Sequence, residues 1–150
     1  MLKESKNIRK LKKLINYNEF DQTLNELDRA YDTINEINGD GYWVWDIEKE
    51  SCYLSSTLKK MLGYNNTELT TYKALNELLV GNDEQRFLIA FNDYVKNREN
   101  KPIQIILNYY HKNGSTLRLL CRGLITNWGI NNEPMKMIGS YVNVTNCKSI

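Results

Sequence analysis

The feature that most constrains this chain is a change of hydrophobic period at residues 38–41, which read Asn-Gly-Asp-Gly. Before this point, apolar or aromatic residues recur at spacings of three and four, the stripe of an amphipathic helix: Tyr17, Phe20, Leu24, Leu27, Tyr31 and Ile34. After it, residues 42–47 are aromatic or β-branched and follow a period of two, which predicts a strand. Glycine ends helices because it adopts positive φ readily. We therefore expect a helical segment over 1–38 and a separate domain over 39–148.

The helical stripe has two interpretations. It covers about two and a half heptads, fewer than the three or four that indicate a coiled coil. As an amphipathic helix it would pack on its own domain. As a dimer helix it would pair with its twin and make the protein a homodimer. The sequence leaves both alternatives open.

The composition fits one soluble domain with an extra segment. The chain has 150 residues, of which 41% are hydrophobic and 25% charged, both ordinary for a globular protein. A net charge of +2 is too small to indicate a nucleic-acid partner, and no apolar run is long enough to span a membrane. The first residues do not resemble a signal peptide. We expect a cytoplasmic protein with reduced thiols at Cys52, Cys121 and Cys147.

The rest of the chain predicts an α+β fold class. Two short strands at 42–47 and 51–54 form a hairpin, and three strands follow at 103–109, 116–127 and 135–145. An Asn-Gly turn joins the first two of these three. Between the two groups we expect a helix over 56–62, a second short helix within 68–80 around Leu75, Leu78 and Leu79, and a longer one capped by Asn82 or Asp83. The expected architecture is a five-stranded antiparallel sheet with short helices on one face and an N-terminal amphipathic helix.

Five short motifs in this order resemble the PAS family, in particular the variant of bacterial signalling proteins whose first strand reads Trp-x-Trp-Asp. Residues 41–46 read Gly-Tyr-Trp-Val-Trp-Asp, and residues 61–64 read Met-Leu-Gly-Tyr after Ser55 and Leu58. Residues 112–115 read Lys-Asn-Gly-Ser. Arg122-Gly123 follows, and then Ile138-Gly139-Ser140 and Asn143-Val144-Thr145. Each motif alone is weak, but their order and spacing together are specific.

The chain also departs from the family pattern. A His-Pro-x-Asp-x-x-Arg motif often precedes the long helix, whereas only Asp83 and Arg86 are present here. A Trp that is common after the Gly-Ser turn is Arg118, and the closing Asp is Asn143. In this family the closing segment helps link sensor to effector, so the resemblance implies a signal-output role for Asn143, Val144 and Thr145. The replacement of Asp by Asn leaves the usual polar contact there in question.

The residues do not indicate catalysis or a known PAS cofactor. His111, the only histidine, lies beside a predicted turn, where an exposed position is expected. No Gly-rich phosphate loop occurs. Haem-binding members usually carry a His on the long helix, and residues 82–97 contain neither His nor Cys. The Asn-Cys-Arg-Phe sequence of photoactive flavin members is absent. We expect no enzyme, no metal, and neither haem nor flavin.

A candidate ligand pocket follows from strand alternation. Trp43 and Trp45 share one face of the first strand and Val44 the other, and the resemblance implies that the Trp face looks into a cavity. The candidate pocket residues are Trp43, Trp45, Leu58, Met61, Leu62, Leu75, Phe87, Phe91, Ile105, Leu107, Tyr109, Leu117, Leu119, Cys121, Met137 and Tyr141. Alternatively, these side chains fill a core that binds no ligand. A real pocket would suit a small, partly polar organic ligand.

We expect a sensory domain of a bacterial signalling protein that binds a small molecule or transmits a signal through its flanking helices. The resemblance implies a downstream effector domain, such as a histidine kinase or a cyclic-dinucleotide enzyme. One alternative is a dimerisation module with a filled core. Another is a small α+β enzyme or a lipid carrier.

Overall fold

A computed structural model of the chain describes residues 17–98 and 100–147, the side chains of residues 17–24 excepted. The chain divides into two compact units with the boundary between Ile34 and Asn35, and each unit is described by itself. No helix in the described part of the chain is long and apolar enough to cross a membrane.

The N-terminal helix α2 spans Tyr17–Asn38 and is followed by Gly39, whose φ of 71° ends it as predicted. The backbone N–H of Gly39 donates to the carbonyl of Glu36 at 3.1 Å, which satisfies a carbonyl at the helix end. Three residues of the stripe have side chains outside the described part of the chain: Tyr17, Phe20 and Leu24. The other three are more than half exposed: Leu27, Tyr31 and Ile34.

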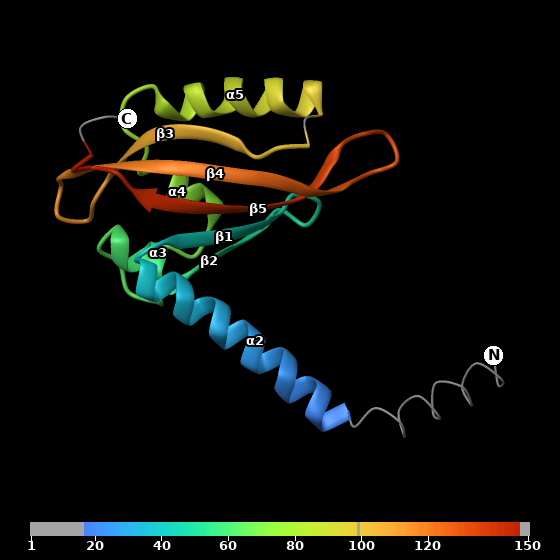
Figure 1. The fold of residues 1–150 in the computed structure, drawn as a ribbon. Coiled ribbons are helices and arrows are strands. Elements are labelled where there is room, and N and C mark those ends of the chain that lie inside the picture. Colours follow the sequence, from blue (N-terminus) through green and yellow to red (C-terminus); the bar gives the residue numbers. More distant parts are fainter. Residues whose placement is uncertain (1–16, 99, 148–150) are drawn as a thin grey trace. The chain divides into compact units, whose positions relative to one another are not determined.

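Five strands form one antiparallel sheet in the order β2-β1-β5-β4-β3 (Figure 1). The strands are β1 (Gly41–Asp46), β2 (Ser51–Leu54), β3 (Ile103–Tyr110), β4 (Thr116–Trp128) and β5 (Pro134–Asn143). The predicted fold class is confirmed. Because β1 lies between β2 and β5, the first strand of the domain pairs with the last, and Trp43 lies opposite Gly139.

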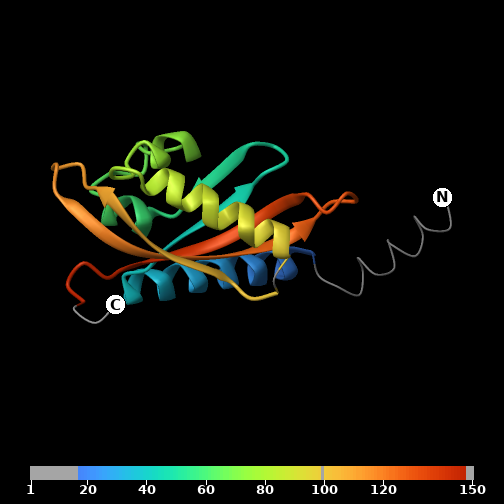
Figure 2. The same cartoon turned by 90° about the horizontal axis from the view of Figure 1, so that it is seen from above.

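Three short helices connect β2 to β3: α3 (Ser56–Met61), α4 (Tyr72–Asn76) and α5 (Asp83–Asn97). The side chains of Ser55 and Thr71 cap the first two, accepting hydrogen bonds from the backbone N–H of Leu58 and Ala74 at 3.2 and 3.0 Å. Such caps satisfy backbone donors that the first turn of a helix leaves unpaired. Helices α4 and α5 lie on one face of the sheet (Figures 1 and 2).

The short helix expected within 68–80 is present as α4, but it ends at Asn76, so Leu78 and Leu79 lie outside it. At the start, Leu69 has a positive φ of 51°, which a helix does not permit. At the end, residues 78–80 bond to the edge of β3 instead. The N–H of Val80 donates to the carbonyl of Asn108 at 2.9 Å, and the N–H of Tyr110 to that of Leu78 at 2.7 Å. These bonds replace the helical ones and cover the edge strand.

The expected cap of the long helix is also different. Asn82 precedes α5, but its side chain makes no capping hydrogen bond. The carboxylate of Asp83 bonds instead to β3, accepting from the backbone N–H and the side-chain amide of Asn108 at 2.7 and 3.0 Å. It also accepts from Arg86 at 2.9 Å. A buried carboxylate therefore fastens the start of α5 to the sheet.

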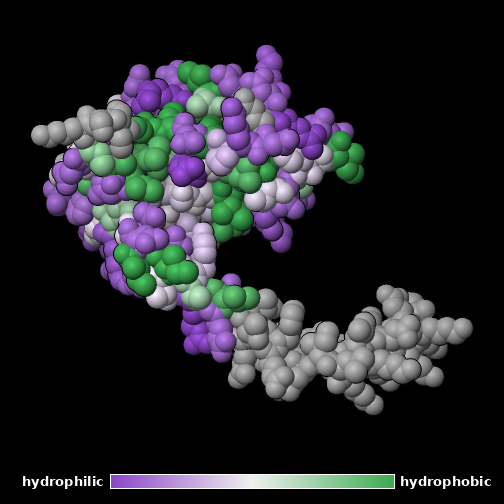
Figure 3. All heavy atoms as spheres, viewed as in Figure 1, coloured by the Kyte–Doolittle hydropathy of each residue, from purple (hydrophilic) through white to green (hydrophobic). Residues whose placement is uncertain are grey.

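The hydrophobic core lies between the sheet and these helices. Its most deeply buried side chains come from every layer: Leu58, Leu62, Leu75, Leu107, Tyr109, Leu119, Cys121 and Met137. Val44, predicted to lie on the face opposite Trp43, is only partly buried, and so are Leu120 and Val142, which alternate with inward-facing residues of β4 and β5. Ile130, in the turn between β4 and β5, is fully exposed, and Figure 3 shows a hydrophobic spot at the tip of that hairpin.

A candidate ligand cavity between the sheet and helices α4 and α5

The indole of Trp43 lies against two glycines on the neighbouring strands. Gly139 is the cross-strand partner of Trp43, and Gly123 is the partner of Gly139. A Cβ atom at Gly139 would lie 2.2 Å from Cζ2 of Trp43, and one at Gly123 would lie 3.3 Å from the same ring. Only glycine leaves this space, so the two residues fix the position of the indole. Trp43 is 4% exposed.

A second layer of aromatic side chains lies between the sheet and the helices. Trp45 of β1 stacks on Tyr72 of α4 with ring centroids 4.6 Å apart and planes 10° apart. The ring centroid of Phe91 in α5 lies 5.6 Å from that of Trp45 and 5.9 Å from that of Phe87. Aromatic pairs at these distances attract one another beyond the burial of their area. The layer therefore forms a wall that α4 and α5 hold in place.

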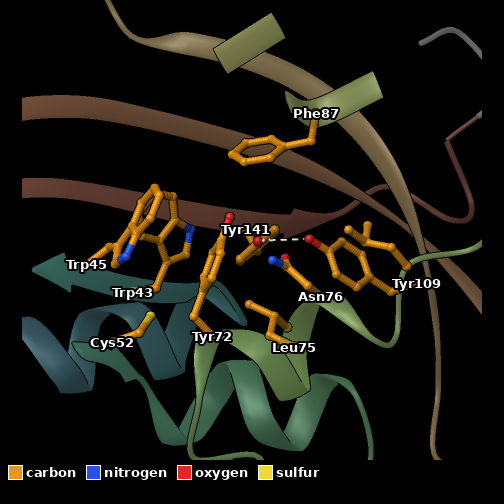
Figure 4. A pocket seen from close by; sticks show the side chains of 10 residues that line it. Trp43, Trp45, Cys52, Tyr72, Leu75, Asn76, Phe87, Tyr109 and Tyr141 are labelled. Carbon is orange, nitrogen blue, oxygen red and sulfur yellow. Dashed lines mark hydrogen bonds between the residues drawn. The ribbon is translucent and has the colours of Figure 1, made fainter. Parts of the chain in front are cut away.

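Polar groups gather inside these apolar walls (Figure 4). The hydroxyls of Tyr109 and Tyr141 lie 2.9 Å apart, and the side-chain amide of Asn76 and the hydroxyl of Tyr72 line the same space. The indole Nε1 of Trp43 is buried and has no hydrogen-bond partner among the described residues. In Figure 4 this nitrogen lies on the side of the ring that faces Tyr72 and Tyr141. Since a buried donor without a partner is uncommon in native proteins, the indole N–H of Trp43 is an unusual feature of the cavity wall.

The space that these side chains leave is small. The cavity volume is about 10 Å³, which is room for about one water molecule. Ten residues line it: Trp43, Trp45, Cys52, Tyr72, Leu75, Asn76, Leu79, Phe87, Tyr109 and Tyr141. A ligand larger than water therefore requires a wall to move.

The cavity is electrically neutral at physiological pH. Its lining residues include no Lys, Arg, His, Asp or Glu. Burial raises the pKa of the Cys52 thiol to about 11 and raises the pKa of Tyr72, Tyr109 and Tyr141 above that of a free tyrosine. All four groups therefore stay protonated, and each hydroxyl can both donate and accept a hydrogen bond.

The structure places the sixteen candidate pocket residues in two groups. Six of them line the cavity: Trp43, Trp45, Leu75, Phe87, Tyr109 and Tyr141. The other ten lie in the surrounding core, where six are buried and four partly buried: Leu58, Leu62, Leu107, Leu119, Cys121 and Met137, and then Met61, Phe91, Ile105 and Leu117. Strand alternation thus identified the inward face correctly but could not separate the cavity wall from the layer behind it.

Four lining residues are absent from the sequence-based set: Cys52, Tyr72, Asn76 and Leu79. Cys52 pairs with Trp45 across the hairpin and shares its face, so the same alternation could have found it. Tyr72, Leu75, Asn76 and Leu79 follow the spacing of one helical face. That spacing is a usable signal, although the face belongs partly to the extended segment that follows α4.

The predicted output segment leaves the sheet at the end of β5 and is held to β4. The N–H of Val144 donates to the carbonyl of Arg118 at 2.8 Å, and the hydroxyl of Thr145 accepts from the N–H of Arg118 at 3.0 Å. The side-chain oxygen of Asn143 accepts from the N–H of Thr145 at 3.0 Å. The amide at position 143 thus supplies an acceptor where the family pattern has a carboxylate.

His111 is not the exposed turn residue that the sequence predicted, because it is half-buried. Its ring packs on Gly63, where a Cβ atom would lie 2.4 Å from Cε1 of the imidazole. The Nδ1 atom accepts from the backbone N–H of Asn113 at 3.0 Å. The histidine therefore joins the end of α3 to the β3–β4 hairpin, away from the residues that line the cavity.

The comparison with family models decides the family. The PAS fold model matches residues 51–141, which is more than half of the chain and covers β2 to β5. The chain belongs to the PAS fold family. A search among curated proteins finds no significant match.

Solved structures of PAS proteins have the same fold. A sensory box histidine kinase/response regulator from Burkholderia thailandensis matches with a TM-score of 0.65 and 24% identity, over 77% of this chain and 85% of that one. A PAS domain from Colwellia psychrerythraea matches with a TM-score of 0.63 and 17% identity, over 82% and 98%. The N-terminal domain of a diguanylate cyclase with a PAS/PAC sensor from Marinobacter aquaeolei matches with a TM-score of 0.59 and 9% identity, over 71% and 95%.

Proposed function

We propose that this PAS domain is a sensor that binds a small organic molecule in the cavity between the sheet and helices α4 and α5. The observation that carries the proposal is the buried indole N–H of Trp43, which faces the cavity and has no hydrogen-bond partner in the described part of the chain. A core that is only packed has no reason to bury a donor in this way, because the lost hydration destabilises the fold. A ligand that accepts this hydrogen bond supplies the reason.

The signal leaves the cavity through β5. Tyr141 contributes its hydroxyl to the cavity, and Asn143, the last residue of β5, begins the segment Asn143 to Thr145 two residues later. A shift of Tyr141 on ligand binding is thereby passed to the segment that leads out of the domain. The mechanism works only if the ligand binds two arrangements of this segment with unequal affinity.

The receiver of the signal is an effector domain beyond residue 150. The histidine kinase and the diguanylate cyclase among the similar structures carry PAS domains of this fold, which supports the same role in a bacterial, cytoplasmic signalling protein. We assign the Trp-x-Trp-Asp variant of the family on residues 43–46, which precede the matched region. The domain itself has no catalytic activity in this proposal.

Thermal unfolding with a metabolite library tests the sensor function. A compound that binds only the folded state raises the melting temperature with its concentration. We expect at least one compound to raise the midpoint of the intact chain. The same compound should have no effect on Tyr72→Trp, whose larger ring fills the cavity. A library without a single stabilising compound contradicts ligand sensing by this domain.

A second candidate function is dimerisation through α2. It is favoured by the exposed apolar side chains of Leu27, Tyr31 and Ile34, which share one face of the helix by their spacing. Sedimentation of the double variant Leu27→Lys, Ile34→Lys tests it, with the substitution Asp28→Lys on another face of α2 as the control. Dimers that dissociate only in the double variant support this role, and dimers that persist in it exclude the helix as the main contact.

A further inference from the structure

The walls of the cavity also indicate which kind of molecule it takes. Resting on the proposed sensor function, we propose that the ligand is an uncharged, planar molecule with a hydrogen-bond acceptor that binds the indole N–H of Trp43. Three features of the cavity support this class of ligand: a hydrogen-bond donor in a fixed position, walls without charge, and an aromatic ring that a ligand can displace.

The fixed donor is the indole of Trp43. Indole nitrogen donates one hydrogen bond and accepts none, so its partner has to be an acceptor. The ring is held against Gly139, where even a Cβ atom would lie 2.2 Å from Cζ2. It is also 4% exposed, so the ring neither turns its N–H toward solvent nor moves closer to the sheet. The acceptor therefore has to come from the cavity side.

The neutral walls decide the charge of the ligand. The ten lining residues carry no ionisable side chain other than one thiol and three phenols, which burial keeps protonated. A carboxylate or phosphate would lose its hydration without meeting a cation. The negative charges of Asp83 and Glu84 act on the hydroxyls of Tyr109 and Tyr72 respectively and raise their pKa further, which also disfavours an anion.

A cation fares no better, because the nearest buried carboxylate is already in use. Asp83 accepts hydrogen bonds from Arg86 and from both nitrogens of Asn108. It also lies outside the lining of the cavity. Aromatic rings attract an ammonium group, but the lining offers it no carboxylate, and the indole N–H of Trp43 presents a hydrogen rather than a lone pair. An uncharged amide, ketone or phenol can accept that hydrogen bond without burying a charge.

The exchangeable ring is that of Tyr72. Tyr72 belongs to the five-residue helix α4, and its ring stacks on that of Trp45 with centroids 4.6 Å apart. The cavity of about 10 Å³ admits an organic ligand only if one wall moves. Tyr72, the aromatic residue of α4, is only partly buried. A flat ligand can take its place against Trp45 and keep the stacking that Tyr72 gives up.

The test compares benzamide with benzoate, which have nearly the same size and shape and differ in charge. Nitrogen-15 correlation spectra of the intact 150-residue chain show three indole N–H signals, because the chain has three tryptophans. The variants Trp43→Phe, Trp45→Phe and Trp128→Phe assign them. Trp128 lies outside the cavity, with the guanidinium of Arg98 4.8 Å from its ring centre, so Trp128→Phe is also the matched control for binding.

We expect benzamide to shift the indole N–H signal of Trp43 downfield in a saturable manner. Benzoate should bind more weakly by on the order of a hundredfold, because it buries a charge without a partner. Trp43→Phe should weaken benzamide binding by about tenfold through the lost hydrogen bond, while Trp128→Phe leaves it unchanged. Far-ultraviolet circular dichroism and the melting temperature of Trp43→Phe confirm that the variant is folded.

Three results overturn the inference. Benzoate binding as tightly as benzamide in the cavity refutes the neutral class, and benzamide binding that Trp43→Phe does not weaken refutes the role of the indole. In both cases ligand sensing itself stands. If neither probe moves the Trp43 signal while charged members of the metabolite library raise the melting temperature, the inference fails alone. If no library compound raises it either, the proposed function fails as well.

Discussion

The hydroxyls of Tyr109 and Tyr141 lie 2.9 Å apart and join β3 to β5 across the intervening strand β4. The two rings meet edge to face, with centroids 5.6 Å apart. The side chains of β3 and β5 are therefore joined on the inner face, in addition to the backbone ladders that both strands form with β4. Both tyrosines line the cavity.

Removing one hydroxyl of the tyrosine pair should destabilise the domain. In Tyr141→Phe the buried hydroxyl of Tyr109 loses its partner, so we expect the free energy of unfolding to fall by about 1–3 kcal/mol. Urea denaturation followed by circular dichroism measures it. Tyr110→Phe is the matched control, because Tyr110 neighbours Tyr109 on β3 and is 43% exposed. Equal losses in the two variants would contradict a structural role for the pair.

The glycine under the indole should be intolerant of even one methyl group. In Gly139→Ala the new Cβ would meet Cζ2 of Trp43 at 2.2 Å and the carbonyl oxygen of Arg122 at 2.6 Å. Overpacking of a core costs about 1–3 kcal/mol, and we expect a loss of this size together with a shifted tryptophan fluorescence maximum. Ser140→Ala, the next residue of β5, serves as the control. An unchanged fluorescence maximum in a destabilised Gly139→Ala would show that the indole does not depend on this glycine.

The ion pair at the start of α5 should make stability fall at acid pH. Burial alone would raise the pKa of Asp83, but hydrogen bonds from Asn108 and Arg86 outweigh it and lower the pKa below its usual range. A folded-state pKa below the unfolded one stabilises the fold above the unfolded value, about pH 4. This stabilisation is lost as the pH falls through the folded-state pKa.

We therefore expect the free energy of unfolding of Asp83→Asn to lie below that of the unchanged chain by about 1–3 kcal/mol at pH 7. The difference should shrink as the pH is lowered below about 4. Asp93→Asn, on the exposed side of the same helix, gives the comparison. A difference that stays constant over this pH range would mean that the carboxylate charge of Asp83 is unimportant.

The three thiols should react at different rates with a thiol reagent. Burial raises the pKa of Cys52 to about 11 and that of Cys121 to about 12, whereas Cys147 is exposed. Since the thiolate is the reactive form, we expect one fast thiol and two slow ones at pH 8. Cys147→Ser should remove the fast phase, and denaturant should make all remaining thiols fast. A second fast thiol in the native Cys147→Ser variant would show that the cavity side of Cys52 is open.

The strands were predictable from the sequence because their signals are local. Alternation placed Trp43 and Trp45 on the inner face, and the Asn-Gly turn joined β3 to β4 as expected. The contact of Trp43 with Gly139 and Gly123 was not predictable, because it depends on which strands become neighbours and in which register. Neighbouring strands come from distant parts of the chain, and no local pattern encodes their order.

The residues that line the cavity also include some that were predictable from the sequence and some that were not. Leu75 and Phe87 follow a helical apolar stripe and were identified. Tyr72 and Asn76 were missed because the expected helix was centred on Leu75, Leu78 and Leu79, whereas the helix ends at Asn76 and Leu79 pairs with the edge of β3. Whether the inner face forms a filled core or a cavity depends on a few ångströms in the position of side chains. Composition and hydrophobic period contain no information about such small differences.

A crystal structure of the protein purified from cells and grown without added ligands tests the central claim most directly. The account predicts electron density in the cavity beside Nε1 of Trp43, within hydrogen-bond distance of that atom and larger than one water molecule. Tyr72 should then have moved away from Trp45. Density for a single water, or none, with Tyr72 still stacked on Trp45 and no change after soaking with the stabilising library compounds, would contradict a ligand-sensing cavity.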